Sequence, residues 1–352
     1  MSELRIPLRY VTGRLLQALG VIFVAWTLAF FLLYALPSDP VSLMLGPDST
    51  GVTEEQQQEL AARYGFDDPV IVQYLHHLLD LLQGDLGYSL QQGAPVTAVI
   101  TGALGPTVRL ALLGLVFAVV GGVSLALLAV RLSTPWLRSW LLALPVLGVS
   151  VPGFWFGLLL IQFFSFRLGW FPAFNATGLT GLVLPALTLA LPTGATVAQV
   201  FARSLLDALD EPYAVTATAK GVPRGTVLLR HAGRNALLPT LTIAGLIVGQ
   251  LFSGTVVTET VFSRPGLGRV IASSVSGQDI PVVLGAVLVG AVLYTGTSFI
   301  VDLLYPLADP RVRTGGIGGG SPAHSPAQTP ERTTASGTPG VPGTTSTAGV
   351  PS

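Results

Sequence analysis

The sequence predicts an all-α membrane protein with six transmembrane helices, and three observations support this fold class. Half of the 352 residues are hydrophobic and only 10% are charged, with a mean hydropathy of +0.66. Six stretches without a charged residue are each long enough to cross a bilayer, which needs about 20 apolar residues of helix. Basic residues gather on alternate sides of these stretches, as they do in multi-pass membrane proteins.

The apolar core of each stretch gives approximate bounds for a helix. We expect transmembrane helices near residues 13–36, 107–130, 139–166, 182–204, 236–258 and 282–304. The alternative is a large soluble protein with very apolar helices, and six such stretches in one chain argue against it. With the N-terminus inside, 13 of the 18 basic residues lie in cytoplasmic segments and five lie outside. Because basic residues mark the cytoplasmic side, both termini are predicted to be cytoplasmic.

Residues 37–105 form a predicted external helical insertion between the first and second spans, and they hold nine of the chain's 18 acidic residues. Residues 53–65 begin with a capping-box pattern, and residues 68–84 begin with Asp68 as a candidate N-cap before Pro69. We therefore expect two short amphipathic helices. The apolar face of the second one comprises Ile71, Leu75, Leu78, Leu79 and Leu82.

The rest of the chain outside the predicted spans divides into three segments. Residues 205–235 are cytoplasmic, and residues 259–281 are expected to form a second external loop. Residues 314–352 consist almost entirely of small and polar residues with proline, so they are expected to form a disordered cytoplasmic tail after a transmembrane domain at 1–313.

No enzymatic motif stands out in the sequence. The signatures of zinc proteases, serine hydrolases and P-loop nucleotide-binding proteins are absent. Four histidines and no cysteine leave little for a metal site, so we expect no catalytic residue, no metal and no cofactor in this chain. A net charge of zero gives no indication of nucleic-acid binding. The predicted spans also lack a charged residue near mid-bilayer, so transport energy is expected to come from a separate ATPase.

The cytoplasmic segment contains a helix of small residues. Ala214, Ala217 and Gly221 recur at helical spacing, which would allow close approach to a partner protein. Tyr213 could anchor such a contact, and Lys220 could pair with an acidic group. The alternative is an ordinary basic loop on the cytoplasmic side.

The stretch "YAVTATAKGVPRGTVLLRHAGRNALLP" at 213–239 closely resembles the cytoplasmic EAA loop of ABC-transporter permeases, in the form found in peptide and nickel importers. Val215 stands where the general family has its first glutamate, which is usual in the peptide branch. The stretches "LPSDPVSLMLG", "ETVFSRPGLGRVI" and "DLLYPLADPRVR" also resemble that branch, specifically its B-type permease subunit. The matching residues of the loop are Tyr213, Thr216, Ala217, Ala219, Lys220, Gly221, His231, Arg234, Asn235, Ala236 and Pro239.

This resemblance implies the type I fold of ABC importer permeases in a bacterial inner membrane. The implied partners are a second homologous permease subunit, two ATP-binding subunits or domains that carry ATP and Mg²⁺, and an external substrate-binding protein. Residues 209–222 would be the coupling helix. The implied ATPase-coupling residues are Tyr213, Ala214, Thr216, Ala217, Ala219, Lys220, Gly221 and Arg224, and the implied hinge into the fifth span comprises Arg230, His231, Arg234, Asn235 and Pro239.

The substrate is expected to be a peptide. Nickel chelates, glutathione or another small solute of the same family remain alternatives, as does an ATP-independent secondary carrier. Polar or kinked positions within spans suggest pore-lining residues, although hydrogen bonding between helices would explain them equally well. The candidates are Ser150, Phe154, Gln250 and Ser253.

Overall fold

The computed structural model describes residues 8–34, 68–89, 91–174 and 178–308, which form mainly helices. The chain divides into two units, Met1–Pro310 and Arg311–Ser352, and all described residues belong to the first. The predicted tail at 314–352 and the predicted amphipathic helix at 53–65 therefore lie outside the described residues.

Four helices in the described part of the chain are long and apolar enough to cross a membrane. The predictions at 13–36, 107–130, 182–204 and 282–304 are confirmed as helices, although each helix is longer than predicted. Two bent helix pairs raise the number of candidate spans to six if each pair is counted as one. The four long helices are α1 (Leu8–Tyr34), α5 (Val96–Arg131), α8 (Thr180–Asp210) and α14 (Ile280–Ala308).

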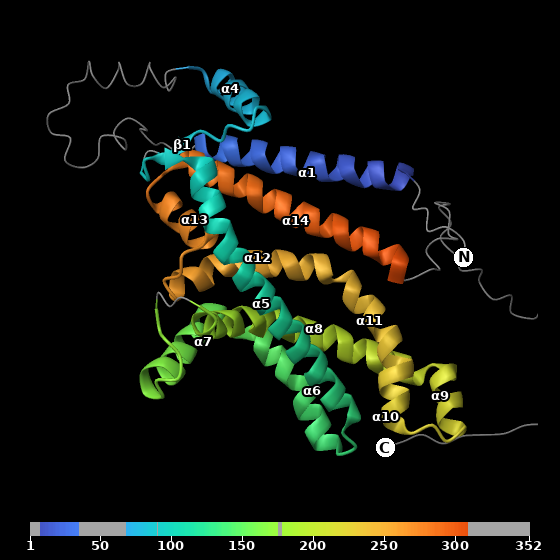
Figure 1. The fold of residues 1–352 in the computed structure, drawn as a ribbon. Helices are drawn as coiled ribbons and strands as arrows, with labels where there is room; N and C mark the ends of the chain where they lie inside the picture. The colour runs from blue at the N-terminus through green and yellow to red at the C-terminus, as the bar shows by residue number, and fades with distance from the viewer. Residues whose placement is uncertain (1–7, 35–67, 90, 175–177, 309–352) are drawn as a thin grey trace, which may run out of the picture. The chain divides into compact units, whose positions relative to one another are not determined.

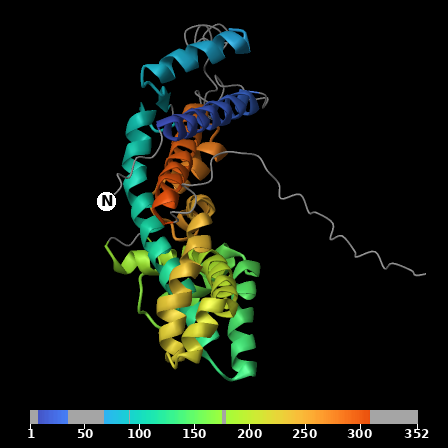
Figure 2. The same cartoon turned by 90° about the vertical axis from the view of Figure 1, so that its right-hand side faces the viewer.

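The most extensive helix contact of the unit is between α5 and α8 (Figure 2), and glycines lie in it. A Cβ atom on Gly122 would lie 2.5 Å from the carbonyl oxygen of Gly194, and one on Gly194 would lie 3.1 Å from the carbonyl oxygen of Ala118. The two backbones therefore approach each other without side chains between them, as small residues permit in membrane helices. Helix α8 continues through Pro185 and Pro192.

The span predicted at 139–166 is not one continuous helix, because the chain breaks there into α6 (Pro135–Ser150) and α7 (Gly153–Leu160). The π-helix η1 (Ile161–Arg167) extends α7, and the two halves meet at 102°. Val151 is extended, with φ −79° and ψ 125°. Because Pro152 sterically disfavours the helical conformation in the residue before it, the break falls at this pair.

The second bent pair follows α8. After the separate helix α9 (Pro212–Ala219), it begins with α10 (Arg224–Thr226) and the π-helix η2 (Val227–Ala232). It continues as α11 (Gly233–Thr242) and α12 (Ala244–Val261), with a bend of 61° between the segments that end at Leu241 and begin at Leu246. The predicted span at 236–258 is therefore two helices with a bend.

Helix α1 packs along α14, and α4 (Val70–Leu82) packs on α1 (Figure 1). Trp26 and Phe30 of α1 are buried, and Tyr74 of α4 contacts both rings. The N-cap of α4 is Pro69 without a side-chain hydrogen bond, so the predicted Asp68 cap is wrong.

The predicted apolar face of α4 is only partly the packed face. Leu78 packs into the contact with α1, together with Tyr74 and Leu81. The other predicted face residues are exposed, because the face that packs is turned from the one expected by about one residue. These are Ile71, Leu75, Leu79 and Leu82.

A short hairpin and a helix cover the N-terminal ends of α5 and α14 and the C-terminal end of α12. Strand β1 (Tyr88–Ser89) pairs antiparallel with β2 (Ala94–Pro95) just before α5. The buried Ser89 hydroxyl donates to Asp279 Oδ2 at 2.5 Å, immediately before α14. Residues 259–281, predicted as a loop between two spans, contain helix α13 (Leu267–Ser276), which was not predicted from the sequence.

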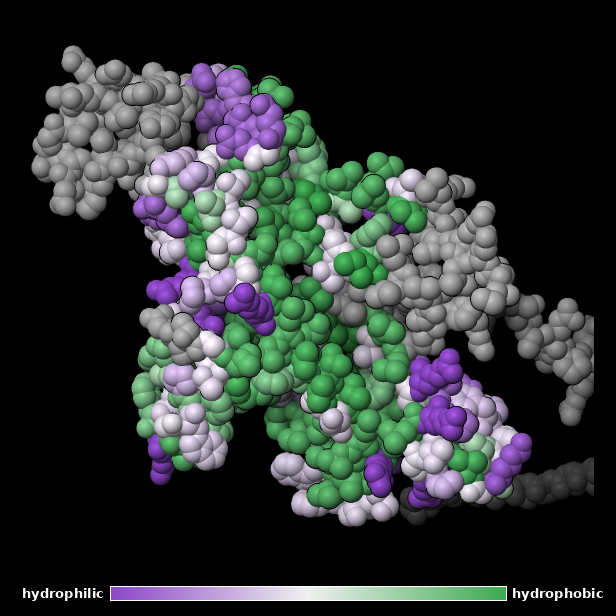
Figure 3. Space-filling model, viewed as in Figure 1, coloured by the Kyte–Doolittle hydropathy of each residue, from purple (hydrophilic) through white to green (hydrophobic). Residues whose placement is uncertain are grey.

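Hydropathy divides the surface of the unit in the way that a membrane would. Figure 3 shows apolar surface across the middle, with hydrophilic surface at α4, beside α13 and around α9 and α10. Many large apolar side chains are exposed, including Leu16 and Leu32 on α1 at 70% each. Lipid or a partner subunit can cover such surface, whereas contiguous exposure on this scale is unusual for a soluble monomer.

Candidate functional site

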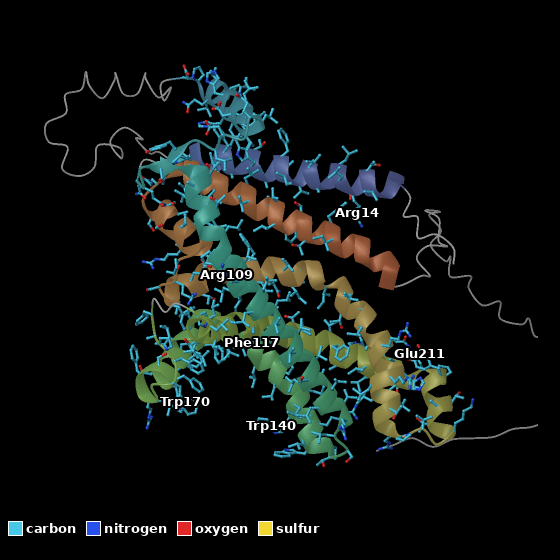
Figure 4. All side chains as sticks on the ribbon, in the orientation of Figure 1. Arg14, Arg109, Phe117, Trp140, Trp170 and Glu211 are labelled. Carbon is cyan, nitrogen blue, oxygen red and sulfur yellow. The ribbon has the colours of Figure 1, made fainter. Side chains whose placement is uncertain are left out.

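The candidate coupling helix is α9 (Pro212–Ala219), which is shorter than the predicted 209–222 because α8 continues to Asp210. Figure 4 places Glu211 at the turn between the two helices, and Pro212 then occupies the first turn of α9. Proline suits this position because its missing N–H would have no partner there and its φ is already helical. The chain thus turns at the extended Glu211, and α9 forms a separate short helix.

One side of α9 is packed inside the chain and the other is exposed. Ala214 is only 1% exposed, so its side chain faces the chain's own interior, where α9 contacts α8 and η2. Ala217 is half-buried. The exposed residues named from the sequence are Tyr213, Thr216, Ala219, Lys220, Gly221 and Arg224.

Gly221 ends α9 in a Schellman motif. Its φ is +80°, its N–H donates to the Thr218 carbonyl at 3.0 Å, and the Val222 N–H donates to the Ala217 carbonyl at 3.2 Å. Glycine adopts this left-handed conformation without the strain that a Cβ atom causes. Gly221 therefore terminates α9, directly after the C-cap residue Lys220.

The predicted hinge residues lie in the helical segment before the bend. His231, Arg234 and Asn235 are exposed on η2 and α11, as are Arg230 and Pro239. Between them, Ala232 and Ala236 are buried against α8 and α5. The bend itself falls at residues 242–245, beyond the predicted hinge.

The four candidate pore-lining residues are exposed in this chain. Ser150 and Phe154 flank the break between α6 and α7, and the Ser150 hydroxyl donates to the Val146 carbonyl of its own helix at 2.8 Å. Gln250 and Ser253 lie on α12. A cavity of about 330 Å³ lies elsewhere, between α5, α6 and α8, with Gln199 and Arg203 in its lining.

A buried carboxylate near the C-terminal end of α12 was not identified as a site from the sequence. Glu259 is 1% exposed, and its Oε1 accepts a hydrogen bond from the Thr107 hydroxyl of α5 at 2.6 Å. Its Oε2 accepts the backbone N–H of Gly268 at 2.7 Å and that of Arg269 at 3.3 Å. The Thr107 oxygen in turn accepts the Leu267 N–H at 2.7 Å.

These contacts replace a conventional N-cap for α13. The N-cap residue is Gly266, which has no side chain to satisfy the first N–H groups of the helix. Thr107 and Glu259 satisfy the first three, and the negative charge lies at the favourable end of the helix dipole. A Cβ atom on Gly266 would lie 2.2 Å from the Glu259 carboxyl, so glycine is required here by space.

Arg264 extends this network to α8. Its Nη1 donates to the Gly181 carbonyl at 2.8 Å. Pro185 lies four residues after Gly181 and has no N–H to donate to that carbonyl. The guanidinium therefore satisfies a backbone oxygen that proline leaves without its helical partner.

Within the described ranges, no three histidine, aspartate or glutamate side chains are close enough together to hold a metal ion.

Comparison with known proteins identifies the family. Residues 118–314 match the binding-protein-dependent transport system inner membrane component, and residues 7–111 match the N-terminal part of such membrane components. The chain belongs to this permease family. It is therefore a multi-pass inner-membrane subunit of an ABC importer, of the type found in peptide and nickel systems.

Relatives align over nearly their whole length. The glutathione transport system permease protein GsiC of Escherichia coli (strain K12) is 36% identical over 307 residues, which are 87% of this chain and 99% of the relative. GsiC of Shigella dysenteriae serotype 1 has the same identity and coverage. A Brucella abortus permease, named provisionally as part of a peptide transport system, is 37% identical over 311 residues, 86% of this chain and 98% of its own.

Proposed function

We propose that this permease pairs with a second homologous permease subunit to form a path for peptides delivered by an external substrate-binding protein. Two ATPase subunits would bind on the cytoplasmic side and supply the energy. The observation that carries the proposal is α9, a short helix set apart from the apolar surface, one side of which packs on the chain while its outward residues are exposed. The permease family supports the same assembly.

The proposed topology has six spans, with each bent pair counted as one and both termini in the cytoplasm. The distribution of basic residues supports it. In Figure 4, Arg14 and Glu211 lie toward one end of the long helices, and Arg109 and Trp170 lie toward the other. Exposed Trp136 and Trp140 near the start of α6 suit an interfacial position.

The proposed substrate class is peptides, including short ones such as glutathione. The names of the relatives support this choice, because they refer to glutathione and peptide transport. Nickel chelates would be the alternative within the family. The carboxylate of Glu259 gives little support to an ion-coupled carrier, because both of its oxygens already accept hydrogen bonds from the protein.

The coupling role of α9 is tested with Ala217→Arg. The half-buried alanine lies beside the exposed surface of α9, so a long cation should prevent close approach of an ATPase subunit. Co-purification of the ATPase and ATP-dependent peptide uptake should both fall by about tenfold or more, as expected for a clash within an interface core. Ser133→Arg, an exposed position in the turn between α5 and α6, is the matched control. Normal assembly and uptake with Ala217→Arg would refute the coupling role.

A further inference from the structure

The outer and inner ends of α12 differ in how they are held. At the outer end, Glu259 joins α12 to Thr107 of α5 and to the first turn of α13 through hydrogen bonds of 2.6 and 2.7 Å. At the inner end, the chain bends by 61° into α11 and continues back to η2 and α9. The covalent path from α9 to α12 therefore runs through this bend.

Close backbone packing reinforces the outer end. A Cβ atom on Gly268 would lie 2.4 Å from the Cα of Val256, so α13 contacts the α12 backbone with no side chain between them. Arg264 adds a bond to the Gly181 carbonyl of α8. Because such packing has few alternative arrangements, α13 can shift relative to α12 only if these hydrogen bonds break.

We propose that Glu259 is a positioning residue of the transport cycle. It keeps the outer ends of α5, α12 and α13 together as one body, so that movement at α9 displaces this body instead of bending α12 alone. Hydrogen bonds from the Thr107 hydroxyl and from the α13 backbone to the carboxylate provide the restraint. The inference rests on the proposed function of α9 and concerns how efficiently hydrolysis is converted into uptake.

The first test measures peptide uptake and ATP hydrolysis in the same liposomes, with the complete transporter and its binding protein. Glu259→Leu should lower the uptake per ATP by about tenfold, a typical scale for residues that modulate coupling between distant sites. Glu259→Gln should stay near wild type, because its oxygen can accept from α13 and its amide can donate to Thr107. Thr101→Val is the control, since this exposed hydroxyl of α5 bonds only to carbonyls of its own helix.

The uptake per ATP distinguishes a positioning role of Glu259 from a role in stability alone. A folding defect reduces the amount of active transporter and lowers both rates in proportion, which leaves the uptake per ATP unchanged. If Glu259→Leu does not assemble, Thr107→Val replaces it, because this variant keeps the carboxylate bonds to Gly268 and Arg269. An unchanged ratio in the assembled variant would overturn the proposal, and so would Glu259→Gln behaving like Glu259→Leu.

A second measurement tests directly whether the ends of α5 and α13 move together as one body. The chain has no cysteine, so spin labels can be placed at Thr101→Cys on α5 and Ser273→Cys on α13, both exposed. Their distance distribution should be narrow and identical with and without ATP, and Glu259→Leu should broaden it. A wild-type distance that changes with ATP would refute a single body. If the wild-type complex shows no ATP-dependent uptake at all, the proposed function fails instead.

Discussion

Gly221 and Gly266 show how far a single residue could be understood from the sequence. Both belong to stretches that resemble the family, yet the resemblance gave no physical reason for either glycine. The structure supplies different reasons: a φ of +80° at Gly221, and the nearby Glu259 carboxyl at Gly266. The first follows from local helix geometry and could have been predicted from a glycine at the end of a short helix. The second depends on tertiary contacts.

A prediction for a single residue concerns the protonation of His77 on α4. Burial against α1 lowers the pKa of His77 below its ordinary value of 6.5, and nearby His76 lowers it further, while Asp80 opposes the shift. The undocked helix therefore binds more protons once the pH falls below about 6.5, so acid weakens the docking of α4 on α1. Above that pH, the docking should not change.

Hydrogen exchange of residues 70–82 checks this expectation. After correction for intrinsic exchange rates, protection at about pH 5.5 should be lower than at about pH 7.5. These two values lie on either side of the ordinary histidine pKa of about 6.5. His77→Phe keeps a ring against Phe30 and should remove the difference. Equal protection at both values in the unmodified chain would contradict the prediction.

Among the elements, the long apolar helices were predictable and the two bends and α13 were not. Hydropathy alone located α1, α5, α8 and α14, because a span must be apolar over its whole length. Pro152 disfavours the helical conformation in the residue before it, but the angle of 102° depends on what packs around the break. Helix α13 was missed because its N-terminus is capped by Thr107, 160 residues before Leu267 in sequence.

The contact between α5 and α8 gives a prediction with an internal control. Gly122→Ala places a Cβ atom 2.5 Å from the Gly194 carbonyl, so the helices must separate. We expect a loss of about 1–3 kcal/mol, as for other overpacked sites, seen as a lower thermal unfolding midpoint in detergent. A Cβ atom on the neighbouring Gly121 would have no other atom within 4 Å. Gly121→Ala should therefore leave the unfolding midpoint unchanged or raise it. Equal midpoints for the two variants would show that this packing does not limit stability.

For the whole molecule, topology is the property that the sequence predicts and that labelling can test. The chain contains no cysteine, so single substitutions report on one site at a time. Ser273→Cys on α13 should react with a membrane-impermeant maleimide in cells whose outer membrane is permeable to it. Ser133→Cys and Thr218→Cys should react only after the inner membrane is opened. Reaction of all three from outside would contradict the six-span arrangement.

The bond between Ser89 and Asp279 also has a consequence for how the protein is made. These residues are 190 positions apart. At about 5–20 residues per second, roughly 10–40 s of synthesis separate the two partners. During that interval, the hairpin beside α5 is complete but has no Asp279 to bond with. The hairpin thus gains its hydrogen-bond partner only when the residue before the final helix has been synthesised. A chain truncated before Asp279 would expose this hairpin to proteases that remove unfinished membrane proteins.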